Sequence, residues 1–391
     1  MSSRITAGID VGTYEVRVVV ARQDPENNLP TILGTGRAES KGLRHGYIIN
    51  TADVTKSVDI ALKQAEKSSG IKIKRAFISI GGVGLSGVNS QGSTMIARAD
   101  QEIIEADTEQ AVLTAEESIP GTLMQNRKII YSIPALWKLD GKPVLGRVLG
   151  MKGIKLETKA LFISCIESHL DDLVQAVEDA GVKVIDVVAS PIAASFVTLS
   201  KSQKIAGCVL ANIGAETVSI VVFENKIPIS LEVFPIGGSD ITNDIALGLK
   251  ISLEEAESIK LGGVTSTSYS RKKLEEIVSA RLGDIFELIE VHLKKIGKFG
   301  ILPAGIIITG GSSSLSIIED LARSYLRLPS RIASLNIIGS EKFQIKDSSW
   351  SVAYGLCIIS NIPDEEERLG LKKHSKNIFK KIMQTLKHLL P

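Results

Sequence analysis

The sequence predicts a duplicated α/β fold in which two similar lobes face each other across a cleft. The main observation is a repeated phrase: Gly8–Thr13 leads into Val16–Val20, and much later Leu210–Ala215 leads into Val218–Val222. Each copy reads as a strand, a turn with glycine and a second strand, which is the pattern of a β-hairpin. Turns that face one another across a cleft can present backbone N–H groups to a chain of phosphates. Two unrelated hairpins are the alternative, but the copies match beyond their turns.

The composition is that of a globular chain with several domains. At 391 residues, with 44% hydrophobic and 23% charged residues, the chain exceeds what one core normally holds. An aromatic content of 4% argues against a nucleic-acid platform. We recognise neither a secretion signal nor an apolar run long enough to span a bilayer. The cysteines Cys165, Cys208 and Cys357 lie far apart in apolar runs, so we expect reduced thiols in a cytoplasmic protein, and the histidines form no metal-ligand cluster.

The first lobe continues after its hairpin with a strand, a helix and a further strand. We expect the strand near Thr31–Ala38, the helix over Ala52–Ser68 and the next strand over Arg75–Ile80. The helix has apolar residues every three or four positions, and Gly70 stands where a C-terminal cap belongs. The lobe is expected to resume much later with a helix, a strand and a helix with proline in its first turn: His169–Ala180, Lys183–Val188 and from Pro191.

Between these two stretches the sequence predicts a small inserted α+β module. Its helix is expected over Asp107–Ser118, because Asp107 with Gln110 three residues later forms a capping signal. Strand-like pieces surround that helix: Leu85–Val88, Ser93–Ala97, Lys128–Ile133 and Ala160–Ile163.

The second lobe repeats the order of the first. A strand at Ile229–Phe234 precedes a helical insertion from Ser239 to about Phe299. A strand at Gly305–Thr309 then ends in Gly310–Gly311, as the first lobe's strand ends in Gly81–Gly82, and a helix is expected over Ser314–Leu326. We therefore assign 1–82 and 165–203 to the first core, 83–164 to its insertion, 204–238 and 300–361 to the second core, 239–299 to the helical insertion, 362–375 to a linker and 376–391 to a C-terminal amphipathic helix.

The C-terminal tail is basic, whereas the rest of the chain is mildly acidic. Lys372–Pro391 holds six lysines and no acidic residue; removing these six from 46 basic residues leaves 40 against 44 acidic ones, so the body is mildly acidic. On a helical wheel the large apolar residues fall on one face, as in a helix that lies in a membrane interface. A helix docked on the protein's own body is the alternative. The apolar face is Ile378, Phe379, Ile382, Met383, Leu386, Leu389 and Leu390.

Several segments resemble a known family. They are Ser40–Asn50, Phe77–Gly82, Ala180–Val184 and Ile308–Ser312. With the duplicated hairpins they resemble the actin, Hsp70 and sugar-kinase superfamily and, within it, FtsA, the actin-like bacterial cell-division family. The resemblance covers nearly the whole chain, including the first-lobe insertion, which the family calls subdomain 1C; the cores are then 1A and 2A and the helical insertion 2B.

The resemblance implies a function and its partners. It implies a peripheral membrane protein at the division site, on the cytoplasmic face of the inner membrane. Such a protein binds ATP with Mg²⁺, forms filaments with itself on an anionic membrane surface, and recruits the C-terminal peptide of FtsZ and later division proteins. No nucleic acid is implied.

The resemblance also implies a nucleotide site. Gly12, Thr13 and Tyr14 would form the first phosphate loop, and Asp10 would hold Mg²⁺ through its waters, although a turn residue bonded to its own backbone is the alternative for Asp10. Glu257 and Lys260 would meet adenosine, or would be a solvated surface pair. The implied nucleotide-binding residues are Asp10, Gly12, Thr13, Tyr14, Asn212, Gly214, Ala215, Glu216, Gly237, Gly238, Glu257, Lys260, Gly310, Gly311, Ser312 and Ser313.

The sequence departs from the family at its second phosphate loop. Asn212 stands where a carboxylate is usual, and Ala215 and Glu216 replace glycines. We expect Glu216 to point to solvent. Ser190 replaces the Glu or Gln that related ATPases use to orient water, so no catalytic residue is assigned and ATPase activity should be weak or absent.

Lys273 and Arg281 are the residues we expect to bind the acidic FtsZ peptide, although a solvated basic face is the alternative. Two other readings of the whole chain stay open. A PilM-like pilus-assembly adaptor shares the fold but typically lacks a basic membrane helix. A sugar kinase would need an acidic base and an intact second phosphate loop, and we find neither.

Overall fold

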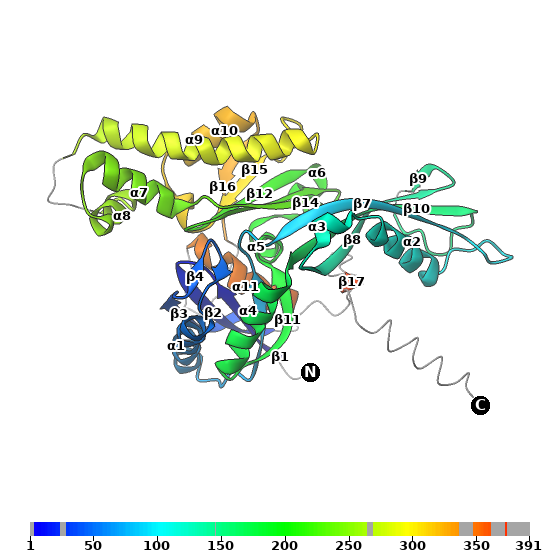
Figure 1. Ribbon diagram of the computed structural model, residues 1–391, viewed down its shortest axis with the longest axis horizontal. Helices are drawn as coiled ribbons and strands as arrows, with labels where there is room; N and C mark the ends of the chain where they lie inside the picture. Colours follow the sequence, from blue (N-terminus) through cyan, green and yellow to red (C-terminus); the bar gives the residue numbers. More distant parts are fainter. Residues whose placement is uncertain are drawn as a thin grey trace. The chain divides into compact units, whose positions relative to one another are not determined.

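The structure is a computed structural model that describes residues 4–23, 29–144, 146–263, 269–335, 347–360 and 372–373. The chain forms two compact units (Figure 1). Unit 1 comprises Met1–Gly87 with Cys165–Pro363, and unit 2 comprises Val88–Ser164 with Asp364–Pro391.

Unit 1 contains two five-stranded sheets of the same topology. The first has the order β11-β6-β1-β2-β3 and the second the order β14-β13-β12-β15-β16. When the first order is read backwards, each of its strands has a counterpart in the second, so that β1 corresponds to β12 and β6 to β15. Asp10 pairs with Arg17 in the first hairpin, as Asn212 pairs with Ser219 in the second. The predicted duplication is confirmed. The strands are β1 Arg4–Val11, β2 Glu15–Gln23, β3 Thr31–Glu39, β6 Arg75–Ile80, β11 Lys183–Ala189, β12 Cys208–Ile213, β13 Val218–Glu224, β14 Ile227–Phe234, β15 Ile306–Thr309 and β16 Ser330–Ile332.

The helix α1, Thr51–Ser69, packs on β3 of the first sheet. Asn50 caps its start by accepting from the Asp53 N–H, and Gly70 ends it in the left-handed conformation that the sequence predicts. The approach of helix and strand is close, because a Cβ on Gly36 would lie 2.0 Å from the carbonyl oxygen of Ala61. A short hairpin, β4 Leu43–Arg44 and β5 Tyr47–Ile48, precedes α1, and α4, Glu167–Asp179, packs beside it.

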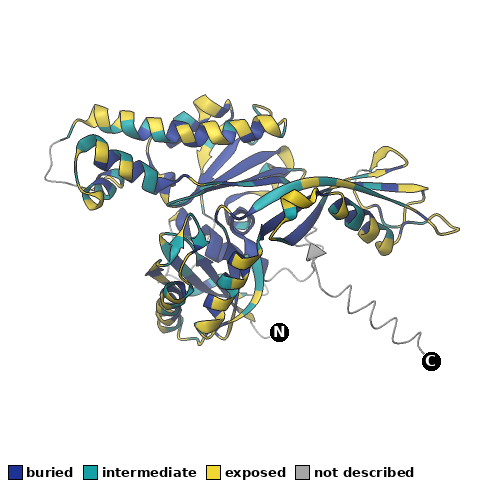
Figure 2. Cartoon of the chain, viewed as in Figure 1, coloured by how far each residue is buried: buried dark blue, intermediate teal, exposed yellow. Residues whose placement is uncertain are grey.

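Two helices that pack together, α5 and α11, belong to the cores of both sheets. α5, Ser190–Thr198, contacts β12 and β13, whereas α11, Ser351–Ile359, contacts β1 and β2. Although its position in the sequence lies in the predicted second core, α11 therefore covers the first sheet, where Tyr354 donates to the carbonyl oxygen of Pro30. The short helix α6 spans Lys201–Ala206, and a turn of 3-10 helix, η2, spans Ser348–Trp350. Figure 2 shows how far the strands of both sheets are buried.

The second sheet is covered by helices from the predicted helical insertion. α7, Gly238–Leu249, contacts α8, Leu253–Lys260, and both follow directly after β14. The long α9, Arg271–Lys295, contacts α7 and α10, and its buried side chains include Phe286 and Leu293. α10 spans Ile318–Leu326 rather than starting at Ser314, because Gly311–Ser314 forms a separate turn of 3-10 helix, η1.

Unit 2 is an α+β module, as its sequence predicts. Its strands are longer than the predicted pieces: β7 Ser86–Met95, β8 Arg127–Leu139, β9 Lys142–Val144 and β10 Lys155–Ile166. The helix α2, Glu105–Glu117, begins before the predicted Asp107, whose carboxylate accepts from the Ile104 N–H at 2.9 Å and so caps the helix from within its first turn. α3 spans Gly121–Met124, and β17, Lys372–Lys373, pairs with β8 although the sequence assigns it to a linker.

The predicted amphipathic helix, 376–391, lies outside the described residues, as does most of the predicted linker. Among the described helices, none is both long and apolar enough to cross a bilayer.

Candidate functional site

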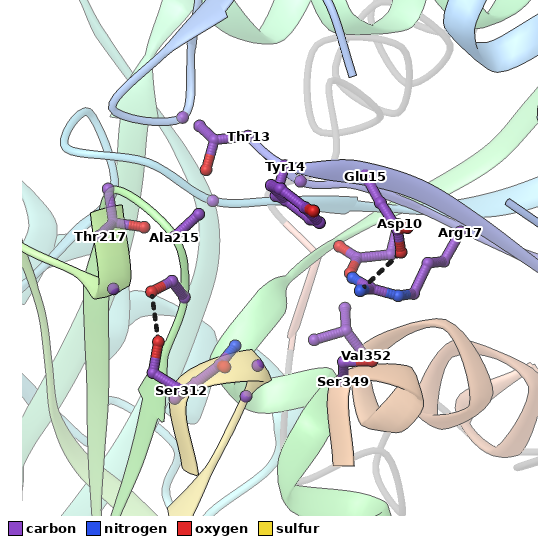
Figure 3. A pocket seen from close by; sticks show the side chains of 18 of the residues that line it. Asp10, Thr13, Tyr14, Glu15, Arg17, Ala215, Thr217, Ser312, Ser349 and Val352 are labelled. Atoms are coloured by element: carbon purple, nitrogen blue, oxygen red, sulfur yellow. Dashed lines mark hydrogen bonds and ion pairs between the residues drawn. The ribbon is translucent and has the colours of Figure 1, made fainter. Parts of the chain in front are cut away.

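A cleft of about 390 Å³ in unit 1 brings the two hairpin turns together. Figure 3 shows Thr13 and Tyr14 from the first turn opposite Ala215 and Ser312 from the second half. Most of the predicted nucleotide-binding residues line this cleft: Asp10, Gly12, Thr13, Tyr14, Asn212, Gly214, Ala215, Gly238, Glu257, Lys260, Gly310, Gly311 and Ser312.

The two turns have matching geometry. The Gly12 N–H donates to the carbonyl oxygen of Glu15 at 3.2 Å, and the Gly214 N–H donates to that of Thr217 at 2.9 Å. Each turn is therefore closed by the same bond from its glycine N–H to the carbonyl oxygen three residues later. Because both turns line one cleft, the backbone between them is placed to meet a chain of phosphates from two sides.

Asp10 lies at the floor of the first turn, where β1 ends. It is 9% exposed, and its carboxylate accepts a hydrogen bond of 2.6 Å from the Ser79 hydroxyl of β6. Burial raises the pKa of Asp10, because the charged form loses hydration. The described residues contain no group of three or more acidic, histidine or cysteine ligands. Asp10 is one of four carboxylates that line the cleft, with Glu15, Glu257 and Asp347, and a carboxylate there fits a cation that keeps most of its water, as Mg²⁺ does.

Glu257 and Lys260 form a fixed pair in the cleft wall, not the solvated pair that the sequence leaves open. Lys260 Nζ lies 2.6 Å from the Glu257 carboxylate and donates to the Gly238 carbonyl oxygen at 3.0 Å and to the Thr242 hydroxyl at 2.9 Å. The Lys260 side chain is only 7% exposed, and the Thr242 hydroxyl donates to Glu257. The network joins α8 to the start of α7 and presents one ammonium and one carboxylate to the cleft.

The glycine turn after β15 reaches the cleft without an α-helix behind it. The 3-10 turn η1 begins at Gly311. The Ser312 hydroxyl donates to the Gly214 carbonyl oxygen at 3.4 Å. The Ser313 hydroxyl instead donates to the Gly310 carbonyl oxygen at 2.8 Å. The helix expected from Ser314 begins instead at Ile318, so η1 rather than the N-terminus of an α-helix follows the glycine pair.

Three of the predicted nucleotide-binding residues do not line the cleft: Glu216, Gly237 and Ser313. Gly237 packs beneath the second turn, since a Cβ there would lie 2.4 Å from the Ala215 carbonyl oxygen. The prediction that Glu216 points to solvent is wrong, and Glu216 does not point into the cleft either. Its carboxylate accepts from the His45 backbone N–H in the first half of unit 1.

A charged group that is not among the residues predicted from the sequence lines the cleft beside the first hairpin turn. Glu15 pairs with Arg17 at 2.9 Å and lies 3.9 Å from Arg37, and all three line the cleft. The guanidinium of Arg17 also lies 5.9 Å from the centre of the Trp350 ring. The available signal was Arg17 itself, a single charged residue within the otherwise apolar strand Val16–Val20. Ser190, the residue that replaces a water-orienting Glu or Gln, lines the same cleft.

Comparison with known proteins identifies the family. Sequence profiles match twice: "Cell division protein FtsA" over residues 209–355 and "SHS2 domain inserted in FTSA" over residues 82–164. The cell division protein FtsA of Borreliella burgdorferi is 30% identical over 406 residues, covering 97% of this chain and 96% of its own length. The chain belongs to the FtsA family. FtsA of Pseudomonas aeruginosa, 27% identical over 91% of this chain and 89% of its own, is similar over the same extent.

Solved structures agree with an actin-like fold. The PilM–PilN type IV pilus biogenesis complex contains a chain with a TM-score of 0.69 and 16% identity, and the match covers 92% of this chain and 99% of that one. MreB 5 of Spiroplasma citri bound to AMPPNP gives a TM-score of 0.53 and 11% identity, covering 98% and 99%. At these identities the likeness concerns the fold alone. It does not favour the PilM-like reading, because the sequence matches are to FtsA proteins.

The residues predicted to bind the FtsZ peptide both lie on α9. Arg281 is already engaged: it pairs with Asp244 of α7 through bonds of 2.7 and 3.1 Å and with Asp284 at 3.2 Å. The carboxylate of Asp244 raises the pKa of Arg281 through these bonds. Lys273, in the first turn of α9, is exposed. Of the two, Lys273 therefore offers its charge to a partner more directly.

Proposed function

We propose that this FtsA-family protein binds ATP with Mg²⁺ in the cleft of unit 1, and that binding sets the conformation in which it assembles. The single observation that carries this proposal is the pair of matching hairpin turns on opposite walls of one cleft. Backbone N–H groups of Thr13 and Tyr14 would contact phosphates from one side, and those of Ala215 and its neighbours from the other.

The remaining residues would complete the site around the nucleotide. Asp10 would order the waters of Mg²⁺, which neutralises phosphate charge when bound. Glu257 would accept from the hydroxyls of the ribose. Lys260, whose three N–H groups already meet Glu257, Gly238 and Thr242, would hold that carboxylate in position. Gly310 and Gly311 would let the backbone approach the adenosine closely.

Hydrolysis would be slow or absent. Asn212 stands at the position equivalent to Asp10 in the second hairpin and carries no charge for organising a second contact to the cation. Ser190 supplies a hydroxyl where a carboxylate or amide would orient an attacking water. The same two positions argue against a sugar kinase, which needs a general base for the substrate hydroxyl.

We further propose that the protein polymerises on the inner membrane face and tethers FtsZ there. Family membership supports a role in cell division, and the basic, one-sided apolar pattern of 376–391 supports membrane contact. Exposed basic residues of α9, with Lys273 foremost, would meet the acidic C-terminal peptide of FtsZ.

Co-sedimentation with vesicles tests this tether. Purified FtsZ should sediment with vesicles of mixed anionic and neutral lipid only when the full chain and ATP are both present. Neutral vesicles serve as the lipid control, and FtsZ without its C-terminal peptide as the partner control. Equal FtsZ recovery with and without the chain would reject the tethering role while leaving nucleotide binding untouched.

A further inference from the structure

A contact beside the cleft residues Ala215 and Gly46 joins the second hairpin turn to a different hairpin in the first half of unit 1. Glu216 follows Ala215 in the second turn, and its carboxylate accepts from the backbone N–H of His45. His45 Nδ1 also lies 3.3 Å from the Glu216 carbonyl oxygen, so the ring donates there when Nδ1 carries its proton. Both residues are half-buried. Two contacts, one from backbone and one from side chain, therefore hold the same pair of residues.

His45 and Gly46 form the two-residue turn between β4 and β5. Both have positive φ, 48° and 73°, as a type I′ turn requires, so the turn is tight and its N–H direction is set. The position of Gly46 excludes any side chain, because a Cβ there would lie 2.4 Å from the Cα of Gly82. The tip of the hairpin therefore packs closely against Gly81 and Gly82, the glycine pair that follows β6.

The tip is also bonded to the wall of the cleft. The Val83 N–H donates to the His45 carbonyl oxygen at 3.2 Å, and Gly46, Gly81 and Gly82 all line the cleft. Tyr47 stacks on His169 of α4 with ring centres 5.0 Å apart. The hairpin is thus fixed to the first half on one side, and Glu216 fixes it to the second half on the other.

We infer that Glu216 is a positioning residue that holds the two halves of unit 1 together through His45 and so slows release of the nucleotide. The contact between Glu216 and His45 is called the clasp below. The inference rests on the proposed binding of ATP in this cleft. A charge-assisted bond contributes more than a neutral one, and it favours the closed arrangement whether or not phosphates are present. When the closed arrangement is stabilised, the two halves separate less often, and a bound ligand is therefore released more slowly.

Three variants test the clasp. Glu216→Ala removes the acceptor, Glu216→Gln keeps an acceptor oxygen without the charge, and Glu117→Ala removes an exposed glutamate of α2 as a matched control. Dissociation of a fluorescent ATP analogue with Mg²⁺, measured by chase with unlabelled ATP, should be about tenfold faster in Glu216→Ala. A tenfold change corresponds to about 1.4 kcal/mol. Glu216→Gln should fall between Glu216→Ala and wild type, and Glu117→Ala should match wild type.

Hydrogen exchange of the nucleotide-free protein separates the clasp from the binding function. The amides of His45 and Val83 should exchange faster in Glu216→Ala than in wild type, while amides of the β1–β2 ladder keep their rates. Unchanged exchange at His45, or unchanged analogue release in a folded Glu216→Ala protein, would overturn the clasp. If wild type binds no ATP, the proposed function and the effect on release both fail, and the exchange rates alone then decide whether the contact exists.

Discussion

The Ser79 hydroxyl donates a 2.6 Å hydrogen bond to the carboxylate of Asp10, joining the ends of β6 and β1 at the floor of the cleft. The bond lowers the pKa of Asp10, but the larger effect of burial raises it. The charged form of Asp10 is therefore less favourable in the folded protein than in water, even with Ser79 and the guanidinium of Arg17 nearby. A carboxylate with a raised pKa that lines a cleft is a candidate for binding rather than for folding.

Replacing Asp10 should separate stability from function. Because the folded pKa is raised, the stability contributed by Asp10 is present below its unfolded pKa and is lost as pH rises through the folded pKa. At neutral pH, Asp10→Asn should thus raise the melting temperature of the nucleotide-free protein, since Asn still accepts from Ser79. The same variant should weaken binding of ATP in the presence of Mg²⁺. A variant that melts lower and binds as well as wild type would contradict this role.

The Lys260–Glu257 pair should show strong coupling in nucleotide binding. Lys260→Met removes a buried ammonium together with its three contacts and leaves Glu257 without that partner. We expect ATP affinity to fall by about tenfold or more for either Lys260→Met or Glu257→Gln, and the double variant to lose less than the two single losses combined. Isothermal titration of all four proteins measures the coupling. Fully additive losses would indicate that the two residues act independently.

His292 should make stability depend on pH in the mildly acidic range. Burial, followed by the nearby Lys295, lowers the pKa of His292 to about 4, and Nε2 lies 2.7 Å from the Ser230 hydroxyl. An unfolded histidine titrates near 6.5, so the unfolded chain binds more protons and stability should fall as pH drops from about 6.5 to about 4. His292→Gln should flatten part of that fall in urea unfolding. A histidine NMR titration with a midpoint near 6.5 would disprove the assignment.

Lys273 tests FtsZ binding more cleanly than Arg281 does. Arg281→Glu would place a carboxylate beside Asp244 and Asp284, so lost affinity could follow from a disturbed α7–α9 contact. Lys273→Glu reverses an exposed charge and should weaken binding of the FtsZ peptide while the melting temperature stays within about a degree. Glu275→Lys, on the same exposed stretch, is the opposite-sign control and should not weaken binding. Unchanged affinity in Lys273→Glu would move the peptide site elsewhere.

The tail should be needed for membrane contact and should hold well only in filaments. Each lysine near an anionic surface contributes about 1 kcal/mol, and a partly buried apolar side chain adds less than the 1.5–3 kcal/mol of full burial. Ordering the helix opposes this by about 1–2 kcal/mol per residue before its hydrogen bonds are counted. Many tails on one polymer bind together because later insertions are intramolecular.

Deleting 376–391 should leave a soluble protein that still binds ATP. Phe379→Glu with Leu386→Glu should release the protein from anionic vesicles, whereas raised salt should loosen the intact protein only in part. Truncated protein that still sediments with vesicles would place membrane binding elsewhere.

The sequence predicts those parts of the site that depend on local pattern. Both hairpins, the glycine turns and the cap at Gly70 follow from residues close in the chain. Glu216 could not be oriented from sequence, because its partner His45 lies far away and is set by a turn in another hairpin. The sequence does not indicate the start of α10, because Gly311–Ser314 forms a 3-10 turn, or the start of α2, because Asp107 caps that helix from its third position.

Nucleotide binding without rapid turnover is tested most directly by measuring ATP binding and phosphate release in the same preparation, with and without Mg²⁺. We predict saturable binding that requires Mg²⁺ for full affinity, with turnover far below the ordinary enzyme range of about 1 per second. Absence of binding, or turnover at about 1 per second or faster, would contradict it.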